Sequence, residues 1–81
     1  MERMWLGAAS KQFKDNWIVA INVTWGEKCM VYGDIYMITP SKDEAYAMAI
    51  LLKKAGQSGK VTVMQGENHT PQVGGLELWS Q

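Results

Sequence analysis

The chain has 81 residues with eight basic and eight acidic side chains, which excludes a dedicated duplex-DNA binder, because such proteins need clustered lysine and arginine against phosphates. One cysteine and one histidine exclude an internal disulfide and a Cys/His zinc site. The size predicts one small domain with a thin stability margin, and an apolar content of 47% argues against disorder.

No segment indicates a membrane or secretory protein. The longest apolar run, residues 45–52, is much shorter than the roughly 18 residues that span a bilayer. Residues 1–10 lack the apolar core of a secretory signal. We therefore expect a cytoplasmic protein without a membrane partner, and no motif predicts a cofactor or metal.

Two strands are predicted in the first half of the chain. Residues 1–15 are ambiguous between an edge strand and a loop. Residues 17–25 alternate strictly between apolar and smaller or polar positions, which predicts a strand with a tryptophan at each end. Residues 29–39 predict a second strand, in which Gly33 indicates a bulge or kink.

The connection between these two strands can be tested by register. A three-residue loop, 26–28, sets Trp25 opposite Cys29 and Trp17 opposite Met37, and so joins apolar residues to apolar residues throughout. A two-residue loop sets apolar residues opposite polar ones. Because a shift of one residue exchanges the faces, we expect the three-residue loop.

Residues 42–55 predict a helix. Ser41 and Glu44 have the spacing of a capping box, and Gly56 supplies a left-handed stop. Tyr46 and Ile50 fall outside the apolar stripe that would face the sheet. The stripe consists of Ala45, Met48, Ala49, Leu51, Leu52 and Ala55.

The remaining elements complete an α+β fold. Residues 61–65 predict a strand, 66–75 a loop and 76–80 a possible closing strand. We therefore expect a small antiparallel sheet of three or four strands, in the element order β-β-α-β-(β), with one helix packed on one face.

The helix is too short to roof a nine-residue strand, so either Trp17 or Trp25 needs another cover. The opposite sheet face is unusually apolar for a face meant only for water. We expect it to bind a partner, unless the N-terminal segment with Met4, Trp5 and Phe13 folds over it. The partner-binding residues predicted on this face and on the helix are Ile18, Met30, Tyr32, Tyr36, Ile38, Tyr46 and Ile50.

No residue pattern predicts catalysis. Cys29 is expected on the core face and His69 in a loop, so they do not form a nucleophile–base pair. The segment "GQSGK" lacks the earlier glycine and the following Ser or Thr of a phosphate loop.

We therefore expect a non-enzymatic protein-binding module. Its format is similar to that of small phage-encoded inhibitors, which implies an accessory or inhibitor protein that binds and masks a host protein. One alternative is a homodimeric structural protein that associates through the open sheet face. Another is a single-stranded nucleic-acid binder that stacks bases on Tyr32 and Tyr36, which the scarcity of nearby basic residues disfavours.

Overall fold

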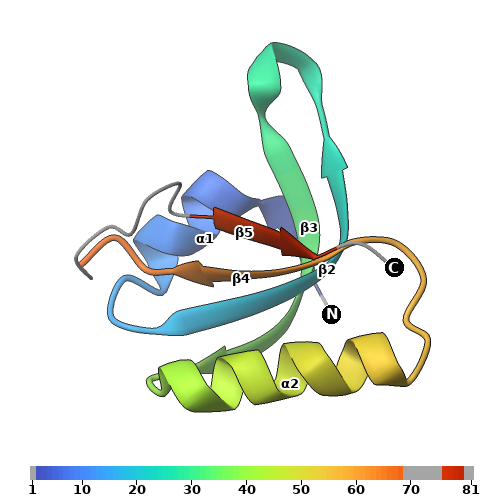
Figure 1. Ribbon diagram of the computed structural model, residues 1–81. Helices are drawn as coiled ribbons and strands as arrows, with labels where there is room; N and C mark the ends of the chain where they lie inside the picture. Colours follow the sequence, from blue (N-terminus) through green and yellow to red (C-terminus); the bar gives the residue numbers. More distant parts are fainter. Residues whose placement is uncertain (1, 69–75, 80–81) are drawn as a thin grey trace.

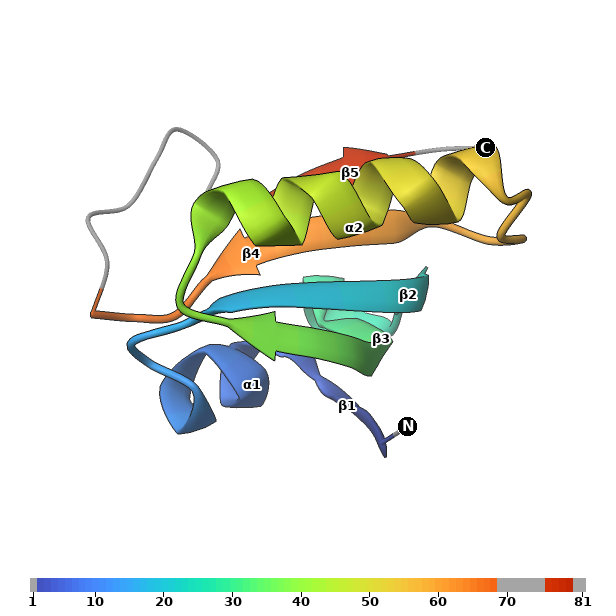
Figure 2. The same cartoon turned by 90° about the horizontal axis from the view of Figure 1, so that it is seen from below.

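A computed structural model of the chain describes residues 2–68 and 76–79. It shows a five-stranded antiparallel sheet with strand order β1-β3-β2-β4-β5 and helices on both faces (Figures 1 and 2). The α+β class is confirmed. The elements are β1 (Glu2–Trp5), α1 (Leu6–Gln12), β2 (Trp17–Trp25), the 3-10 turn η1 (Glu27–Cys29), β3 (Val31–Thr39), α2 (Lys42–Lys54), β4 (Val61–Gln65) and β5 (Leu76–Trp79).

Helix α2 begins where its sequence signal lies. The Ser41 side chain accepts a hydrogen bond from the Glu44 backbone N–H at 3.2 Å, which confirms this half of the predicted capping box. The other half differs, since the Ser41 N–H donates to the Thr39 hydroxyl oxygen at 3.1 Å and not to the Glu44 carboxylate. The Glu44 carboxylate accepts a hydrogen bond from the Thr39 hydroxyl at 2.7 Å and so connects the helix to the end of β3. The helix ends at Lys54, one residue before the predicted end, and Ala55 caps it.

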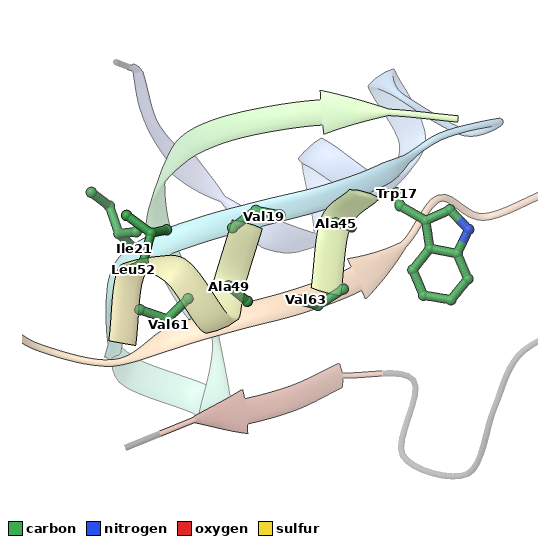
Figure 3. Close-up of a cluster of buried hydrophobic side chains, with 8 residues drawn as sticks. All are labelled: Trp17, Val19, Ile21, Ala45, Ala49, Leu52, Val61 and Val63. Atoms are coloured by element: carbon green, nitrogen blue, oxygen red, sulfur yellow. The ribbon is translucent and has the colours of Figure 1, made fainter. Parts of the chain in front are cut away.

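The first hydrophobic core lies between α2 and one face of the sheet (Figure 3). Small alanines let the helix approach β2 and β4 closely, and the sheet supplies larger aliphatic side chains. Trp17 closes one end of this core and is only 6% exposed. Its members are Trp17, Val19, Ile21, Ala45, Ala49, Leu52, Val61 and Val63.

The second core lies on the opposite face, under α1. Leu6 and Ala9 of this helix are 2% and 0% exposed, and Met4 and Phe13 pack at its margin. The expectation of a face with no second helix is therefore wrong, and the alternative, in which the N-terminal segment covers it, is confirmed for Met4 and Phe13 but not for Trp5, which is 39% exposed. The members of this core are Leu6, Ala9, Ile18, Ala20, Val23, Val31 and Met64.

The predicted register of β2 and β3 is wrong by two residues at both ends of the ladder and by one residue at Ala20 and Ile21. Trp17 lies opposite Thr39 and Trp25 opposite Val31, so the connection has five residues, 26–30, and β3 begins at Val31 instead of residue 29. The prediction chose the register that pairs apolar with apolar side chains, and it failed because it assumed an uninterrupted ladder. The ladder contains two irregularities, and Tyr36 at one of them has no opposite residue in β2.

The second irregularity changes which face Val23 serves. Asn22 and Val23 of β2 together oppose the single residue Gly33, and Asn22 has a φ of 53°. Beyond this bulge the alternation restarts, so Val23 joins the core under α1 instead of the core under α2, where strict alternation placed it. The bulge near Gly33 was predicted, but the extra residue lies in β2.

Three expectations for α2 need correction. Leu51, which the stripe assigned to the core, is 59% exposed, and Ala55 is also exposed. Tyr46, expected to face away, is half-buried, with its ring centroid 6.1 Å from that of Trp17. The Lys42 ammonium lies 5.8 Å from the Trp17 ring and 5.9 Å from the Tyr46 ring, which adds two cation–π contacts at the helix start.

The N-terminal segment is tied down by the residues that follow β4. The backbone N–H of Gly66 donates to the Asn16 carbonyl at 2.8 Å, and that of Asn68 donates to the Lys14 carbonyl at 2.9 Å. The approach at Gly66 is so close that a Cβ there would overlap the backbone of residues 13–14. Neither helix of the described chain is long and apolar enough to cross a bilayer.

Some expectations concern residues that are not described. His69, the part of the expected loop at 69–75 and the last residue of the expected strand, Ser80, lie outside the described residues, as does the side chain of Cys29.

Candidate interaction site

The β2–β3 hairpin stands out from the rest of the sheet (Figure 1). On one side, β4 pairs with β2 only between Trp17 and Ala20, and on the other, β1 pairs with β3 only from Tyr32 onward. Residues 24–32, which we call the hairpin tip, therefore extend beyond both neighbouring strands, except that Tyr32 at its last position pairs with Trp5 of β1. An unsupported hairpin must be held by its own contacts or by those at its base.

Backbone hydrogen bonds close the turn at the end of this hairpin. The Gly26 N–H donates to the Met30 carbonyl at 2.6 Å, and the Met30 N–H donates to the Glu27 carbonyl at 3.2 Å. Between them Lys28 has φ 57° and ψ 33°, a left-handed conformation that costs free energy in a lysine. The turn is thus closed in a defined geometry with a charged residue at its end.

Large apolar side chains are exposed on and beside the hairpin tip. Trp25 is 53% exposed and Trp5 is 39% exposed. Tyr32 is half-buried because its ring packs on the Gly26 backbone, where an added Cβ would lie 3.0 Å from the ring. Its hydroxyl lies 4.0 Å from the Met30 sulfur, to which it donates. The tip therefore combines one open tryptophan with a fixed tyrosine and methionine.

The aromatic side chains occupy both faces of the hairpin. Trp5 lies opposite Tyr32 in the register, and Trp25 lies opposite Val31. Directly opposed residues share a face and successive residues alternate, so Trp25 belongs to the α1 side and Tyr32 to the α2 side. A partner that grips the tip would meet an aromatic residue on either side.

A polar cluster locks the base of the hairpin. The Arg3 guanidinium donates to the Asn22 carbonyl at 3.1 Å, to the Asp34 carboxylate at 3.3 Å and to the Thr24 hydroxyl. The Asn22 side-chain amide donates to the other Asp34 oxygen at 3.1 Å. We call Arg3, Asn22, Thr24 and Asp34 the base cluster; it joins β1, β2 and β3 at the bulge.

The base cluster also changes the ionisation of Asp34. The hydrogen bond from Asn22 lowers the pKa of the Asp34 carboxyl below its usual range, and Arg3 lowers it further through its hydrogen bond and positive charge. Asp34 is therefore a carboxylate throughout the neutral range, and the cluster remains paired there. The base cluster acts as a structural clamp, because the Arg3 guanidinium donates its hydrogen bonds to groups of the protein itself.

Ile18 does not belong to any surface. Its side chain is 0% exposed and packs in the core under α1. Its expected exposure is wrong because the second helix covers its face of the sheet. The homodimer expected through that open sheet face loses its surface for the same reason.

The other predicted residues of β3 are divided along the strand. Met30 and Tyr32 come together at the hairpin tip. Tyr36 is 42% exposed at the bulge, and Ile38 is 39% exposed opposite Ile18. The structure thus does not gather these residues into one patch.

The two predicted residues on α2 also differ in role. Tyr46 packs against Trp17 at the edge of the first core. Ile50 is 42% exposed on the outer surface of the helix. Only Ile50 of this pair is open to a partner.

Reasoning from the sequence missed three features of the site, wholly or in part. The strand-length argument indicated that one bounding tryptophan outreaches the helix; the structure shows that it is Trp25, while Trp17 is buried. The role of Arg3 has no local signal, because its partners are 19, 21 and 31 residues away. For Trp5 the sequence holds only a weak signal, the glycine two residues later. A Cβ at Gly7 would overlap the Trp5 ring, so the glycine leaves room for it.

In the ranges that the structure describes, no three His, Cys, Asp or Glu side chains gather in a group that could hold a metal ion. In comparisons with protein-family models, curated proteins and solved structures, none matched the chain. The α+β fold and the exposed hairpin are therefore the basis on which a function can be argued.

Proposed function

We propose that the protein is a non-enzymatic protein-binding module that attaches to and masks another protein through the hairpin tip. The observation that carries this proposal is Trp25, which is 53% exposed on a hairpin that extends beyond its neighbouring strands (Figure 1). A tryptophan left this open in a small domain adds nothing to the cores on either side of the sheet.

The residue types at the tip support protein binding. Tryptophan and tyrosine are the side chains most enriched among residues that dominate binding energy, and methionine adapts its shape to a partner surface. Trp25, Tyr32 and Met30 supply these three types within the hairpin tip. Glu27 and Lys28, both exposed, give the polar rim that usually surrounds such an apolar centre.

The base cluster supports the proposal in a second way. It holds the bulge and the two strands of the hairpin in one arrangement, so less conformational entropy is lost when a partner binds. The same clamp uses Arg3 against Asp34, which weakens the case for a nucleic-acid site at the tip, because phosphate binding needs free basic groups.

The more specific part of the proposal concerns the kind of partner. The format of the chain is similar to that of small phage-encoded inhibitors, so we infer an accessory or inhibitor protein of phage or mobile-element type. It would act in the cytoplasm on a host protein. A compact domain that presents one rigid aromatic hairpin can occupy a pocket or a groove and exclude the natural ligand.

Affinity capture with matched baits tests this proposal. Three baits are exposed to a lysate of the source cells: the wild-type chain, Trp25→Ser and Leu51→Ser. Leu51 is the control, because it is also exposed and apolar but lies on α2, away from the tip. We expect a protein captured by the wild type and by Leu51→Ser, and lost with Trp25→Ser.

Calorimetry with the purified captured protein then gives the magnitude. We expect Trp25→Ser to weaken binding by about thirtyfold or more, as for a dominant interface residue. Its free energy of unfolding should stay within about 1 kcal/mol of wild type, because the side chain lies outside both cores. Equal capture by Trp25→Ser, or binding of labelled single-stranded DNA at low salt that this variant abolishes, would contradict the proposal.

A further inference from the structure

The outer surface of α2 carries a straight stripe of exposed residues: Asp43, Ala47, Ile50 and Lys54. At about 100° per residue these four positions fall within roughly 60° of one another, so they run along the helix axis. Ile50 is 42% exposed, and Leu51 beside the stripe is 59% exposed. We call Asp43, Ala47, Ile50 and Lys54 the outer stripe.

The outer stripe takes no part in either core, although Asp43 in the first turn and Lys54 in the last turn also complement the dipole of α2. The sheet-facing side of α2 consists of Ala45, Ala49 and Leu52, which lie against β2 and β4 (Figure 3). The outer stripe lies on the opposite side of the helix. A helix face meant only for water would carry polar residues at its centre, whereas this one carries the exposed Ile50, with the exposed Leu51 beside it.

The order of residues along the outer stripe is self-complementary. It begins with the acid Asp43, passes through the small Ala47 and the large Ile50, and ends with the base Lys54. A second α2 laid antiparallel, with the two-fold axis between residues 48 and 49, sets Asp43 of each copy opposite Lys54 of the other. The same arrangement sets each Ala47 opposite Ile50, so a large side chain meets a small one.

We propose that the outer stripe binds a second copy of this chain through an antiparallel α2–α2 contact. Two-fold symmetry requires one patch that complements itself, and this patch does so in both charge and size. A parallel contact would instead oppose like charges. This proposal goes beyond the hairpin function and does not depend on it, because the tip lies away from α2 (Figure 1).

The size of the surface sets the strength of the dimer. Helix α2 has 13 residues and is therefore about 20 Å long. A contact between two such helices buries less area than the roughly 1,200 Å² at the low end of stable interfaces. We therefore infer a weak, concentration-dependent dimer that presents two hairpin tips to its targets, which raises their combined affinity for a partner with two sites.

Charge reversal tests this pairing directly. Asp43→Lys alone opposes two lysines at each end of the dimer, and Lys54→Asp alone opposes two aspartates. Mixing the two variants restores opposite charges at both ends of a heterodimer. The association is measured by sedimentation from about 1 μM to about 1 mM, with circular dichroism to confirm that each variant is folded.

We expect the wild type to dimerise, each reversal alone to weaken association by about tenfold or more, and the equimolar mixture to regain it. Lys11→Asp is the matched control, because it also removes an exposed cation from the last turn of a helix, but from α1. It should leave association unchanged. A wild type that stays monomeric throughout the range, a mixture no better than either variant, or a dimer insensitive to both reversals would overturn the proposal.

Discussion

At the scale of single residues, Asn22 determines the arrangement of the sheet at the base of the hairpin. Its φ of 53° places it in the left-handed region, which asparagine tolerates better than most side chains. Its amide also donates to Asp34, so one residue both forms the bulge and holds the hairpin base. The bulge in turn directs Val23 into the core under α1.

Two substitutions at Asn22 separate the effect of its backbone conformation from that of its side-chain hydrogen bond. Asn22→Val should lower the free energy of unfolding by about 1–3 kcal/mol, because a β-branched side chain is strained at positive φ and the amide is lost. Asn22→Gly loses the same amide without the strain, so it should cost clearly less. Urea unfolding of both variants measures the difference, and equal costs would show that backbone strain plays no part.

The ionisation of Asp34 predicts a dependence of stability on pH. The folded pKa of this carboxyl lies below its unfolded value, so its contribution is fully present above the unfolded pKa of about 3.9. It is lost as the pH falls through the folded pKa. Asp34→Asn should therefore be less stable than wild type at pH 7, and this difference in stability should be smaller at about pH 3, below the unfolded pKa. Thermal unfolding at both pH values tests this, and a gap that is constant or widens in acid contradicts it.

At the scale of elements, the sequence predicts what local signals specify. Helix α2 was predictable because Ser41 caps it and its small residues recur at helical spacing. Helix α1 was not, because it has seven residues, no side-chain cap and no acidic residue in its first turn. Its stability comes from packing on the sheet, which a local pattern cannot reveal.

The hairpin shows the same limit for the candidate site. Both strands were predicted, but their register depends on two bulges. One adds a residue to β3 and the other adds a residue to β2, so a register predicted for an uninterrupted ladder fails. The exposure of Trp25 followed in part from strand length. The base cluster did not, because Arg3 meets Asn22 and Asp34 only after β1 pairs with β3.

Two matched leucines test the covering role of α1. Leu6→Ala should lower the free energy of unfolding by about 2–4 kcal/mol, because it opens a cavity where the side chain is 2% exposed. Leu51→Ala makes the same chemical change at a position that is 59% exposed, and should cost less than about 0.5 kcal/mol. Urea unfolding at low micromolar concentration, where a weak α2–α2 contact would be dissociated, compares them. Equal costs would mean that α1 does not seal the sheet.

At the scale of the whole molecule, β2 is the structural centre. It pairs with β3 on one side and β4 on the other, and its two faces supply side chains to the two cores. Val19 and Ala20, which point to opposite cores, are both 0% exposed. Local unfolding of one part of the domain therefore cannot expose β2 without disrupting a core.

The consequence of that central position concerns proton exchange with solvent. The amides of Val19 and Ala20 should exchange with deuterium only when the whole domain unfolds, so their opening free energy should equal that from urea unfolding. The amides of Glu2–Trp5, at an edge of the sheet, should exchange through local opening at a lower free energy. Amide exchange followed by NMR measures both. Equal protection of the two strands would mean that the domain opens only as one unit, edge strand included.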